Sequence, residues 1–365
     1  MCRQYFELSI ALEDGRLDGP ADIRFISLKH IDSTSDSAMV SDSGAGAIDG
    51  EGIAACRTDD LAADADIGGI GALASSVLFV STEDPPRVVE VDKASGAVVP
   101  PPKGLAIDFA SQTPLSPTTV IHNKQLESLT CGGGVLYTAN EGPLTVDGEP
   151  ATHVSVGSVR IFTFNVDAGK LVHTARYDLE PSAFEDCDST GLVDLEVLRP
   201  GAAGAGGALL LAMERCYSRT RGNSIKVFAV DLSAAADISG CKSFASGCAD
   251  GAAVPKIPVV DLSDVETLEG ADLMLDNYEG LALGPTLVDG RRMLLLVNDD
   301  NYNQHQIGTQ FVAFAITVLD EVLDEALALS EKAEHFNERA DILRWRSRQN
   351  EARTRRPSRW GGGLR

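Results

Sequence analysis

The chain has 365 residues, of which 44% are hydrophobic, and its 54 acidic and 31 basic residues give a formal net charge of −23. This charge argues against a nucleic-acid partner for the main body, and the hydrophobic content is enough for a large core. No run of about 18 apolar residues occurs, so the sequence predicts no membrane-spanning helix.

Short strands joined by turns are predicted over most of the chain. Residues 1–32 are typical of two strands connected through Asp14-Gly15, and the polar segment 33–49 is typical of an exposed loop. From residue 48 to residue 316, short apolar or alternating runs such as Val159–Asn165 follow one another. The 35 glycines and 16 prolines suit the many turns that such strands need.

An acidic residue recurs within a short phrase at four places in this strand-rich region. The phrases are Asp49–Ala54, Gln125–Thr130, Asp194–Leu198 and Asn277–Ala282, and their acids are Glu51, Glu127, Glu196 and Glu279. A second apolar run with acidic or amide residues near its end follows each phrase: Val77–Asp84, Val135–Glu141, Leu209–Glu214 and Met293–Asp300. Repetition of this kind predicts an array of equivalent strands whose ends lie close together.

The predicted fold class is therefore all-β. Units of three or four antiparallel strands around an axis favour a β-propeller of about six or seven blades over a β-sandwich. The first blade would be incomplete if the chain lacks its natural start. The propeller is expected to span residues 1–317.

The end of the chain has a different character. Apolar residues at helical spacing predict a C-terminal helical extension over 318–352, either packed on the main domain or anchoring an acidic partner. Residues 341–365 contain eight arginines against Asp341 and Glu351, and 353–365 is predicted to be a disordered basic tail.

The seven cysteines include no CxxC pair, so a zinc site is not expected. Cys187 with Cys216, and Cys241 with Cys248, could form disulfides in an oxidising compartment; free thiols in a reducing compartment are the alternative. No secretory signal is visible in the sequence as it begins. The protein is expected to be cytoplasmic, or secreted or in the secretory pathway if the N-terminus is incomplete.

Several motifs resemble those of a known family. They are Asp276–Pro285, Asp289–Asn301 with Gln306 and Thr309-Gln310, Asn140–Leu144, Leu210–Arg215, Asp49–Ala54 and Ser81–Asp84. Together they make the chain, over roughly residues 1–317, similar to the phytase-like domain, also described as the esterase-like activity of phytase. The resemblance implies a β-propeller and hydrolysis of phosphate or other esters.

The chain also departs from the family pattern. In the family a Gly-Leu-Ser-Gly strand and a Ser-Asp-Asp element precede the segment that corresponds to Tyr5–Leu12, where this sequence nearly begins. Ser128 stands where the family usually has glycine, and the helical extension is not part of the family.

The recurring acids and amides are ligands of the kind that calcium prefers. The predicted metal ligands are Glu51, Glu83, Glu127, Asn140, Asn277, Glu279 and Asp300. If the innermost strands line a channel, these side chains converge at its mouth, and their pKa values would rise unless a cation neutralised them. Calcium is the predicted cofactor. The alternative is that Glu51, Glu127, Glu196 and Glu279 join blade to blade by hydrogen bonds or ion pairs.

Catalytic and substrate-binding roles are predicted for the second set of polar residues. The expected catalytic residues are Glu141, Glu214, Asp299 and Arg215, and the expected substrate-binding residues are Arg160, Lys256 and Asn301. Arginine and lysine would hold an anionic ester group, or else pair structurally with acids. No Gly-x-Ser-x-Gly elbow is present, so a serine nucleophile has no support.

These observations predict a phytase-like or esterase-like hydrolase of phosphate or carboxylic esters, assisted by calcium at the channel mouth. A non-catalytic propeller that binds a ligand or a protein, with a structural metal or none, is the alternative, and a propeller lactonase is a third. The expected partner is a small-molecule ester, with no nucleic acid and no membrane span, and the protein is expected to be a monomer.

Overall fold

The computed structural model describes residues 3–12, 21–31, 50–57, 76–82, 86–92, 97–101, 104, 106–115, 118–121, 124–201, 207–249, 253–266, 272–299, 306 and 308–316. The chain divides into two compact units, Met1–Leu319 and Asp320–Arg365. The predicted helix over 318–352 and the basic tail over 353–365 lie outside the described residues.

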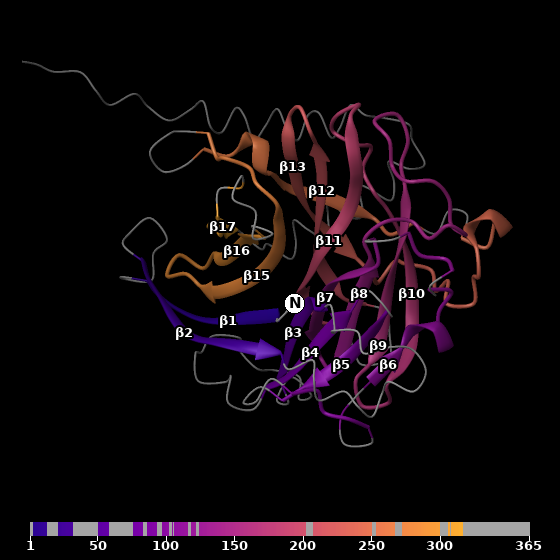
Figure 1. Cartoon of the computed structure of the whole chain (residues 1–365), viewed down its shortest axis with the longest axis horizontal. Coiled ribbons are helices and arrows are strands. Elements are labelled where there is room, and N and C mark those ends of the chain that lie inside the picture. Colours follow the sequence, from indigo (N-terminus) through magenta and orange to yellow (C-terminus); the bar gives the residue numbers. More distant parts are fainter. Residues whose placement is uncertain are drawn as a thin grey trace, which may run out of the picture. The chain divides into compact units, whose positions relative to one another are not determined.

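The described residues form 17 strands, arranged as one hairpin and four antiparallel sheets (Figure 1). The hairpin pairs β1 (Arg3–Leu12) with β2 (Ala21–Ile31). The first two sheets contain β3 (Gly50–Arg57), β4 (Ser76–Thr82), β5 (Arg87–Val91) and β6 (Ala106–Asp108), and then β7 (Leu126–Gly132), β8 (Val135–Asn140), β9 (Ser158–Asn165) and β10 (Lys170–Asp178). The other two contain β11 (Cys187–Arg199), β12 (Leu209–Ser218), β13 (Gly222–Asp231) and β14 (Lys256–Asp261), and then β15 (Tyr278–Thr286), β16 (Arg292–Asn298) and β17 (Phe311–Ile316).

Each of the four sheets is a meander in which strands pair in chain order. Tight turns make this possible: Gly133 and Gly134, between β7 and β8, have φ values of 61° and 73°, which favour glycine and match the twist of a two-residue hairpin. The prediction of an all-β fold is confirmed. None of the helical turns in the described part of the chain has the length and apolar character needed to cross a bilayer.

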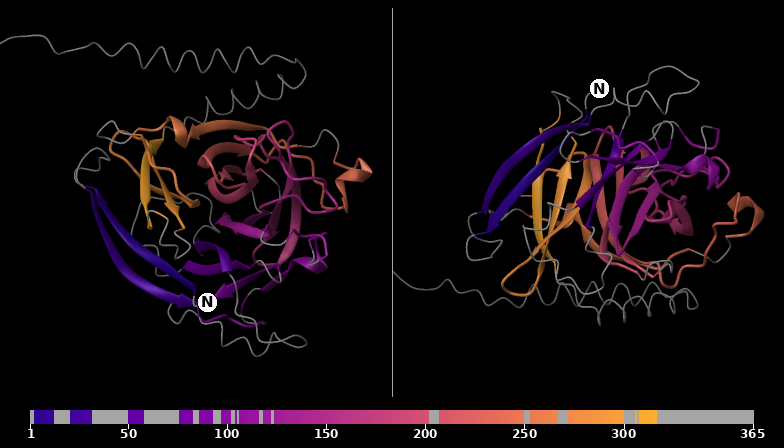
Figure 2. Two further views of the ribbon diagram at one scale, coloured as in Figure 1. Left: turned by 45° about the horizontal axis from the view of Figure 1, so that its top comes forward. Right: turned by 90° about the horizontal axis from the view of Figure 1, so that it is seen from below.

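The first strands of neighbouring sheets lie against one another, β3 against β7, β7 against β11 and β11 against β15 (Figure 2). Buried carboxylates of β11 join these strands. The Asp194 carboxylate accepts the Leu281 N–H at 2.6 Å, and Glu196 accepts the Leu283 N–H and the Thr130 hydroxyl, each at 3.1 Å. The sheet-to-sheet role considered for Glu196 is confirmed.

Burial also affects the ionisation of Glu196. It raises the pKa of that carboxyl to about 7, although the hydrogen bonds from Leu283 and Thr130 act in the opposite direction. Burial also raises the pKa of Asp194 well above its ordinary value. Burial at this junction therefore favours the neutral form of both carboxyl groups over the ionised form.

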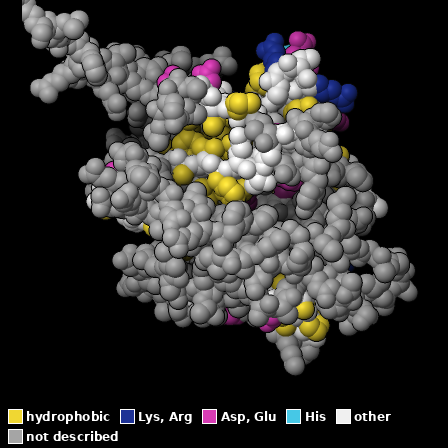
Figure 3. All heavy atoms as spheres, turned by 60° about the vertical axis from the view of Figure 1, so that its left-hand side comes forward, with side chains coloured by type: hydrophobic (Ala, Val, Ile, Leu, Met, Phe, Trp, Pro, Cys, Tyr) yellow, Lys and Arg dark blue, Asp and Glu magenta, His cyan; other side chains and the backbone are white. Residues whose placement is uncertain are grey.

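Two apolar clusters fill the space between the sheets. One lies between the β3–β6 and β7–β10 sheets, where the Phe109 ring packs 5.5 Å from Phe162 and 4.8 Å from Phe164. The other lies between the β7–β10 and β11–β14 sheets and contains Tyr137 and Leu210. Strand β8 is buried along its whole length because both of its faces are covered. By contrast, β17 is only partly buried, and hydrophobic side chains reach the surface on the side shown in Figure 3.

Disulfides fix two local segments. Cys187–Cys216 joins β11 to β12 with a Cα–Cα distance of 5.9 Å, and Cys241–Cys248 closes a loop with a Cα–Cα distance of 5.8 Å. Both distances suit a disulfide. Cys131 is disulfide-bonded as well. Of the two alternatives considered for these cysteine pairs, the structure has the disulfides and not the free thiols.

A fully buried ion pair connects the disulfide loop to the β7–β10 sheet. Arg160 in β9 donates through Nε and Nη2 to the two carboxylate oxygens of Asp147, both at 2.7 Å, and through Nη1 to the Cys241 carbonyl at 2.7 Å. Neither side chain is exposed to solvent. Removal of one partner would leave the other as an uncompensated buried charge.

We expect Asp147→Asn to lower the free energy of unfolding by about 3–5 kcal/mol, because the Arg160 charge would lose its partner in a dry environment. Urea denaturation measures this loss. The matched control is Asp289→Asn, since Asp289 pairs with Arg291 at the surface with about half of each side chain exposed, and that pair should contribute far less to stability. Equal losses in the two variants would contradict the structural role of the buried pair.

Candidate functional site

The first strands of three sheets share a β-bulge at the same point of their register. The residue that each bulge leaves without a cross-strand partner is Glu127 in β7, Val193 in β11 and Glu279 in β15. A bulge changes the direction in which a side chain points. Glu127 and Glu279 are therefore structurally equivalent. The repeated phrases predicted that Glu196 is equivalent to these two residues. That prediction is wrong, because Glu196 lies further along β11 than the bulge.

The register also corrects the alignment of the second strands. The residues paired just before each bulge are Asn140 in β8, Glu214 in β12 and Asn298 in β16. It follows that Arg215, and not Glu214, is the equivalent of Glu141. The backbone of β3 has its own register break between Gly50 and Ile53, which spans Glu51.

Asn140, Glu214 and Asn298 all bind the backbone of an adjacent loop. Asn140 Nδ2 donates to the Gly142 carbonyl at 2.6 Å, and Asn298 Nδ2 donates to the Gly308 carbonyl at 2.9 Å. The Glu214 carboxylate accepts the Glu180 N–H at 2.9 Å. The residue at this shared position therefore holds an adjacent loop in place. In the structure Asn140, which was predicted as a metal ligand, and Glu214, which was predicted as catalytic, both have this structural role.

Glu214 has two further partners that surround its buried carboxylate. Its Oε1 accepts the Tyr177 hydroxyl and the Lys256 ammonium, each at 2.6 Å, and Lys256 also donates to the Asp178 carbonyl at 2.6 Å. Burial and the Glu214 charge raise the Tyr177 pKa well above its ordinary value. Lys256 and Arg160 thus both have the acid partners that were the alternative to substrate binding.

The residues that follow this shared position form a different arrangement. Four charged side chains gather around Glu141, which directly follows β8. We call the five residues together the charge cluster: Lys124, Glu127, Glu141, Arg215 and Glu279. Lys124 forms an ion pair with Glu141. Arg215 Nη2 lies 2.9 Å from Glu279 Oε1 and 3.8 Å from Glu141 Oε1. The cluster joins three of the sheets.

Within the described part of the chain, two carboxylate oxygens of the charge cluster have no hydrogen-bond partner. They are Oε2 of Glu127 and Oε2 of Glu141, and both are buried. Burial and the nearby charges of Glu141 and Glu279 raise the pKa of Glu127 well above its ordinary value, against the opposing effects of Arg215 and Lys124. A buried carboxyl with unused oxygens beside a second carboxylate is an arrangement more typical of reactive sites than of structural ones.

Protonation of Glu127 balances the charge of the cluster. Neutral Glu127 leaves the carboxylates of Glu141 and Glu279 against the cations of Lys124 and Arg215, a net charge of zero. Glu141 is 1% exposed, whereas the side chains of Lys124, Arg215 and Glu279 are 17%, 14% and 26% exposed. The cluster therefore has a buried carboxylate, that of Glu141, beside three charged side chains that solvent partly reaches.

Gly191 allows the Glu141 carboxylate to occupy this position. It lies in β11 against Glu141, and a Cβ at residue 191 would collide with the carboxylate group. The Leu192 N–H donates to the Glu141 carbonyl at 3.0 Å and fixes the backbone beside it. Neither Gly191 nor Lys124 was predicted from the sequence, because each lies outside the second apolar runs.

Calcium does not fit the charge cluster as these residues are arranged. The Lys124 ammonium and the Arg215 guanidinium already supply the positive charge that a metal would provide. No group of three or more His, Cys, Asp or Glu side chains among the described residues is arranged to hold a metal ion. Glu83, Asp300 and the side chain of Glu51 lie outside what the structure describes, and for them calcium stays a prediction. Asn301 lies outside it as well, and its substrate-binding role stays a prediction.

The remaining predicted residues lie near the β15–β16 sheet. The Asp299 N–H donates to the Asn277 carbonyl at 2.9 Å, just as the Glu141 N–H donates to the Gln125 carbonyl at 2.6 Å. The Asp299 side chain is exposed, and Asn277 is buried. Asp299 is thus the positional equivalent of Glu141 without its burial.

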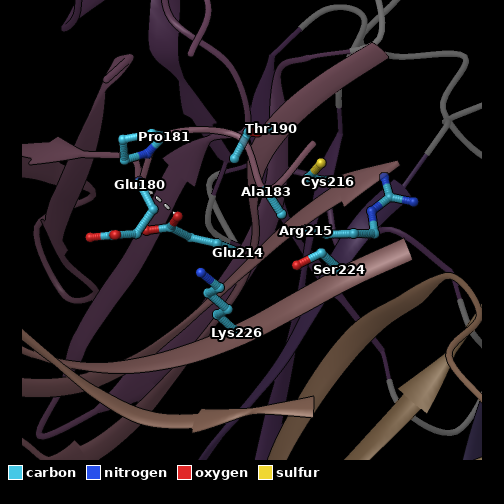
Figure 4. A pocket seen from close by; sticks show the side chains of 9 residues that line it. All are labelled: Glu180, Pro181, Ala183, Thr190, Glu214, Arg215, Cys216, Ser224 and Lys226. Atoms are coloured by element: carbon cyan, nitrogen blue, oxygen red, sulfur yellow. Dashed lines mark hydrogen bonds between the residues drawn. The ribbon is translucent and has the colours of Figure 1, made fainter. Parts of the chain in front are cut away.

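A small pocket adjoins the cluster through Arg215. Its volume is about 10 Å³, enough for about one water molecule. Figure 4 shows Glu180, Glu214 and Lys226 grouped on one side of it, while the Arg215 side chain extends the other way. The pocket is too small for a substrate, but it places polar side chains beside the charge cluster.

Comparison with known proteins agrees with the motifs in these strands. The model of the phytase-like family, described as the esterase-like activity of phytase, matches residues 7–302. The chain belongs to the phytase-like family. No curated protein and no solved structure matched the chain. The family match includes every described residue of the charge cluster.

The raised pKa of Glu127 should make the free energy of unfolding depend on pH. The native state binds this proton more tightly than the unfolded chain, so the stabilisation is complete below the unfolded pKa of 4.5 and is lost as the pH rises through the native value. Urea unfolding of the wild type and Glu127→Gln from acidic to alkaline pH measures it. We expect the wild type to lose stability relative to the variant as the pH rises.

The matched control is Glu149→Gln, because Glu149 is an exposed glutamate. Its stability difference from the wild type should not change with pH in this way. A difference between Glu127→Gln and the wild type that is constant across the pH series would show that the Glu127 pKa is not raised.

Proposed function

We propose that the chain is an ester hydrolase that uses the charge cluster as its active site. The observation that carries the proposal is the pair of buried, unpartnered carboxylate oxygens on Glu127 and Glu141, next to two cations. Membership of the phytase-like family supports hydrolysis of an ester bond.

We further propose that the sheets are blades of a β-propeller. In support, each of the four sheets is a meander, and its first strand lies against the first strand of the next sheet. In a propeller these innermost strands line the central channel. The charge cluster, which uses residues of or next to β7, β8, β12 and β15, would then lie at one mouth of that channel. A count of about six or seven blades stays a prediction.

In this mechanism two carboxyl groups divide the acid and base roles. Ionised Glu141 takes a proton from water as its oxygen attacks the phosphorus or carbonyl carbon. The bond to the alcohol oxygen breaks, and neutral Glu127 gives that oxygen its proton. Transfer of a proton from Glu141 to Glu127 restores the starting state, so that one water is consumed and an acid and an alcohol are released.

Lys124 and Arg215 act on the charged part of the substrate. Each is partly exposed and already bound to a carboxylate, so an anionic oxygen of the substrate could share its N–H donors. These two cations would stabilise the negative charge that develops in the transition state. They favour a small ester with an anionic group, such as a phosphate monoester, over a neutral ester.

A calcium-assisted reaction is a separate proposal. It would use Glu51, Glu83, Asp300 and Asn301, and calcium would polarise the ester and activate water. The two proposals differ in one result: a chelator should abolish the calcium-assisted reaction and leave the reaction of the charge cluster in place.

A non-catalytic binding protein is the second candidate function. The observation in its favour is that Arg215 bridges Glu141 and Glu279 and so ties three sheets together, as a purely structural group would do. The binding of a ligand or a protein would then use the same surface without chemistry.

The disulfides indicate the redox environment in which the protein works. We propose that the protein works in an oxidising environment, because Cys187–Cys216, Cys241–Cys248 and the disulfide-bonded Cys131 would not persist in a reducing cytosol.

The proton-donor role of Glu127 predicts a dependence on the leaving group. Glu127→Gln should lower kcat by about 100- to 10,000-fold on phenyl phosphate, whose alcohol needs a proton to leave, and much less on p-nitrophenyl phosphate. The decline of wild-type activity at alkaline pH should disappear in the variant. Steady-state kinetics with both substrates, with calcium and with a chelator, measures these effects.

Glu149→Gln is again the control, and its kcat should match that of the wild type on both substrates. Equal losses on the two substrates in Glu127→Gln would contradict a proton-donor role. If the wild type hydrolyses no phosphate ester, carboxylic ester or lactone with or without calcium, the hydrolase proposal is wrong and the binding function is favoured.

A further inference from the structure

A second, larger cavity lies on a different part of the molecule, and we call it the outer pocket. Its volume is about 430 Å³, and its walls come from the loop after β8, from β9 and β10, and from the loop closed by Cys241–Cys248. The lining residues used below are Val146, Asp147, Ser158, Arg176, Phe244 and Ala245. None belongs to the charge cluster, and the volume is in the range of small-molecule sites.

The charges at the outer pocket are already paired. Asp147 is bound by Arg160, and Arg176 binds Asp178 through Nε at 2.8 Å and Nη2 at 3.2 Å. Ser158 Oγ also donates to Asp178, at 2.6 Å. The wall therefore carries no net charge. A charged ligand would have to break one of these pairs or remain unpaired itself.

The pocket nonetheless offers polar groups. A guanidinium has five N–H donors, and Arg176 uses three of them, since its third bond goes from Nη1 to the Ala249 carbonyl at 3.1 Å. Its side chain is 21% exposed, so its remaining N–H groups can donate to the hydroxyl oxygens of a ligand. The Ser158 hydroxyl, which also lines the pocket, can accept a hydrogen bond from the same ligand.

An apolar wall faces these polar groups. Phe244 is partly exposed, and its ring centroid lies 4.4 Å from the Arg160 guanidinium and 5.7 Å from that of Arg176. Val146 and Ala245 extend this wall. The loop that carries Phe244 is held by its disulfide, by the Phe244 N–H on Asp147 at 3.2 Å and by the Ser243 hydroxyl on the Val146 carbonyl. The wall is thus formed before any ligand binds.

We propose that the outer pocket binds a neutral sugar. A pyranose ring has adjacent hydroxyls that suit the Arg176 N–H donors and the Ser158 hydroxyl, and its C–H face suits Phe244 and Val146. It carries no charge that would disturb the two ion pairs. The site would place a sugar, free or as part of a larger glycoside, on the β7–β10 sheet, independently of ester hydrolysis.

Saturation-transfer NMR and titration calorimetry on the intact, oxidised protein test this proposal. The probes are the methyl glycosides of glucose, galactose, mannose and N-acetylglucosamine, with sodium benzoate as an anionic probe that also has a flat apolar face. We expect at least one glycoside to bind saturably with a Kd near 1 mM, and benzoate not to bind.

Ala245→Trp is the informative variant, because Ala245 is exposed in the pocket wall and a large side chain there fills the cavity without removing an ion pair. It should weaken glycoside binding by at least about tenfold. Ala236→Trp is the matched control, since Ala236 is exposed on a nearby part of the chain but does not line the pocket, and it should bind as the wild type does.

Three results would overturn the proposal: no saturable binding of any glycoside to the wild type, binding of benzoate alone, or glycoside binding that Ala245→Trp leaves unchanged. None of these results depends on ester hydrolysis, so the outer pocket and the charge cluster can fail separately.

Discussion

The burial of carboxyl groups between the first strands of the sheets is the constraint on which the rest of the structure depends. Asp194, Glu196 and Glu127 all lie on these strands and are half-buried, and burial is the largest cause of the raised pKa of each. An ionised carboxylate in such a place needs hydrogen bonds or cations, and otherwise keeps its proton. The way in which each acid meets this requirement separates the structural positions from the reactive ones.

Asp194 and Glu196 meet it through hydrogen bonds from the neighbouring strands, and in doing so they fix the sheets to one another. Glu127 and Glu141 meet it only in part, because one oxygen of each remains unpartnered while Lys124 and Arg215 supply positive charge nearby. The same kind of residue therefore serves as a joint in β11 and as a proposed proton donor in β7. The difference comes from the neighbours and not from the acid itself.

The sequence predicted the all-β class, and it singled out Glu127, Glu141, Arg215 and Glu279, which the structure brings together, because the repeated phrases are local. It left the two cysteine pairs open between disulfides and free thiols. It did not predict the alignment of β11 and β12 with their counterparts. The position of a bulge depends on cross-strand pairing, so that Val193 and Arg215, and not Glu196 and Glu214, take the equivalent places. The sequence also did not predict which residues pair with the buried charges, because the partners are far apart in the chain. Lys256 and Glu214 are 42 positions apart, and Arg160 and Cys241 are 81 positions apart.

The ionisation state of Glu127 is the central claim, and it can be measured directly. NMR of the protein labelled with ¹³C at the glutamate side-chain carboxyl carbons, with Glu127→Gln to assign the resonance, follows the titration of this one group. We predict that its midpoint lies well above the ordinary value of 4.5, because burial and the neighbouring acids favour the neutral form. A midpoint close to 4.5 would show that Glu127 is ionised at neutral pH, and would contradict both the charge balance of the cluster and the role of Glu127 as proton donor.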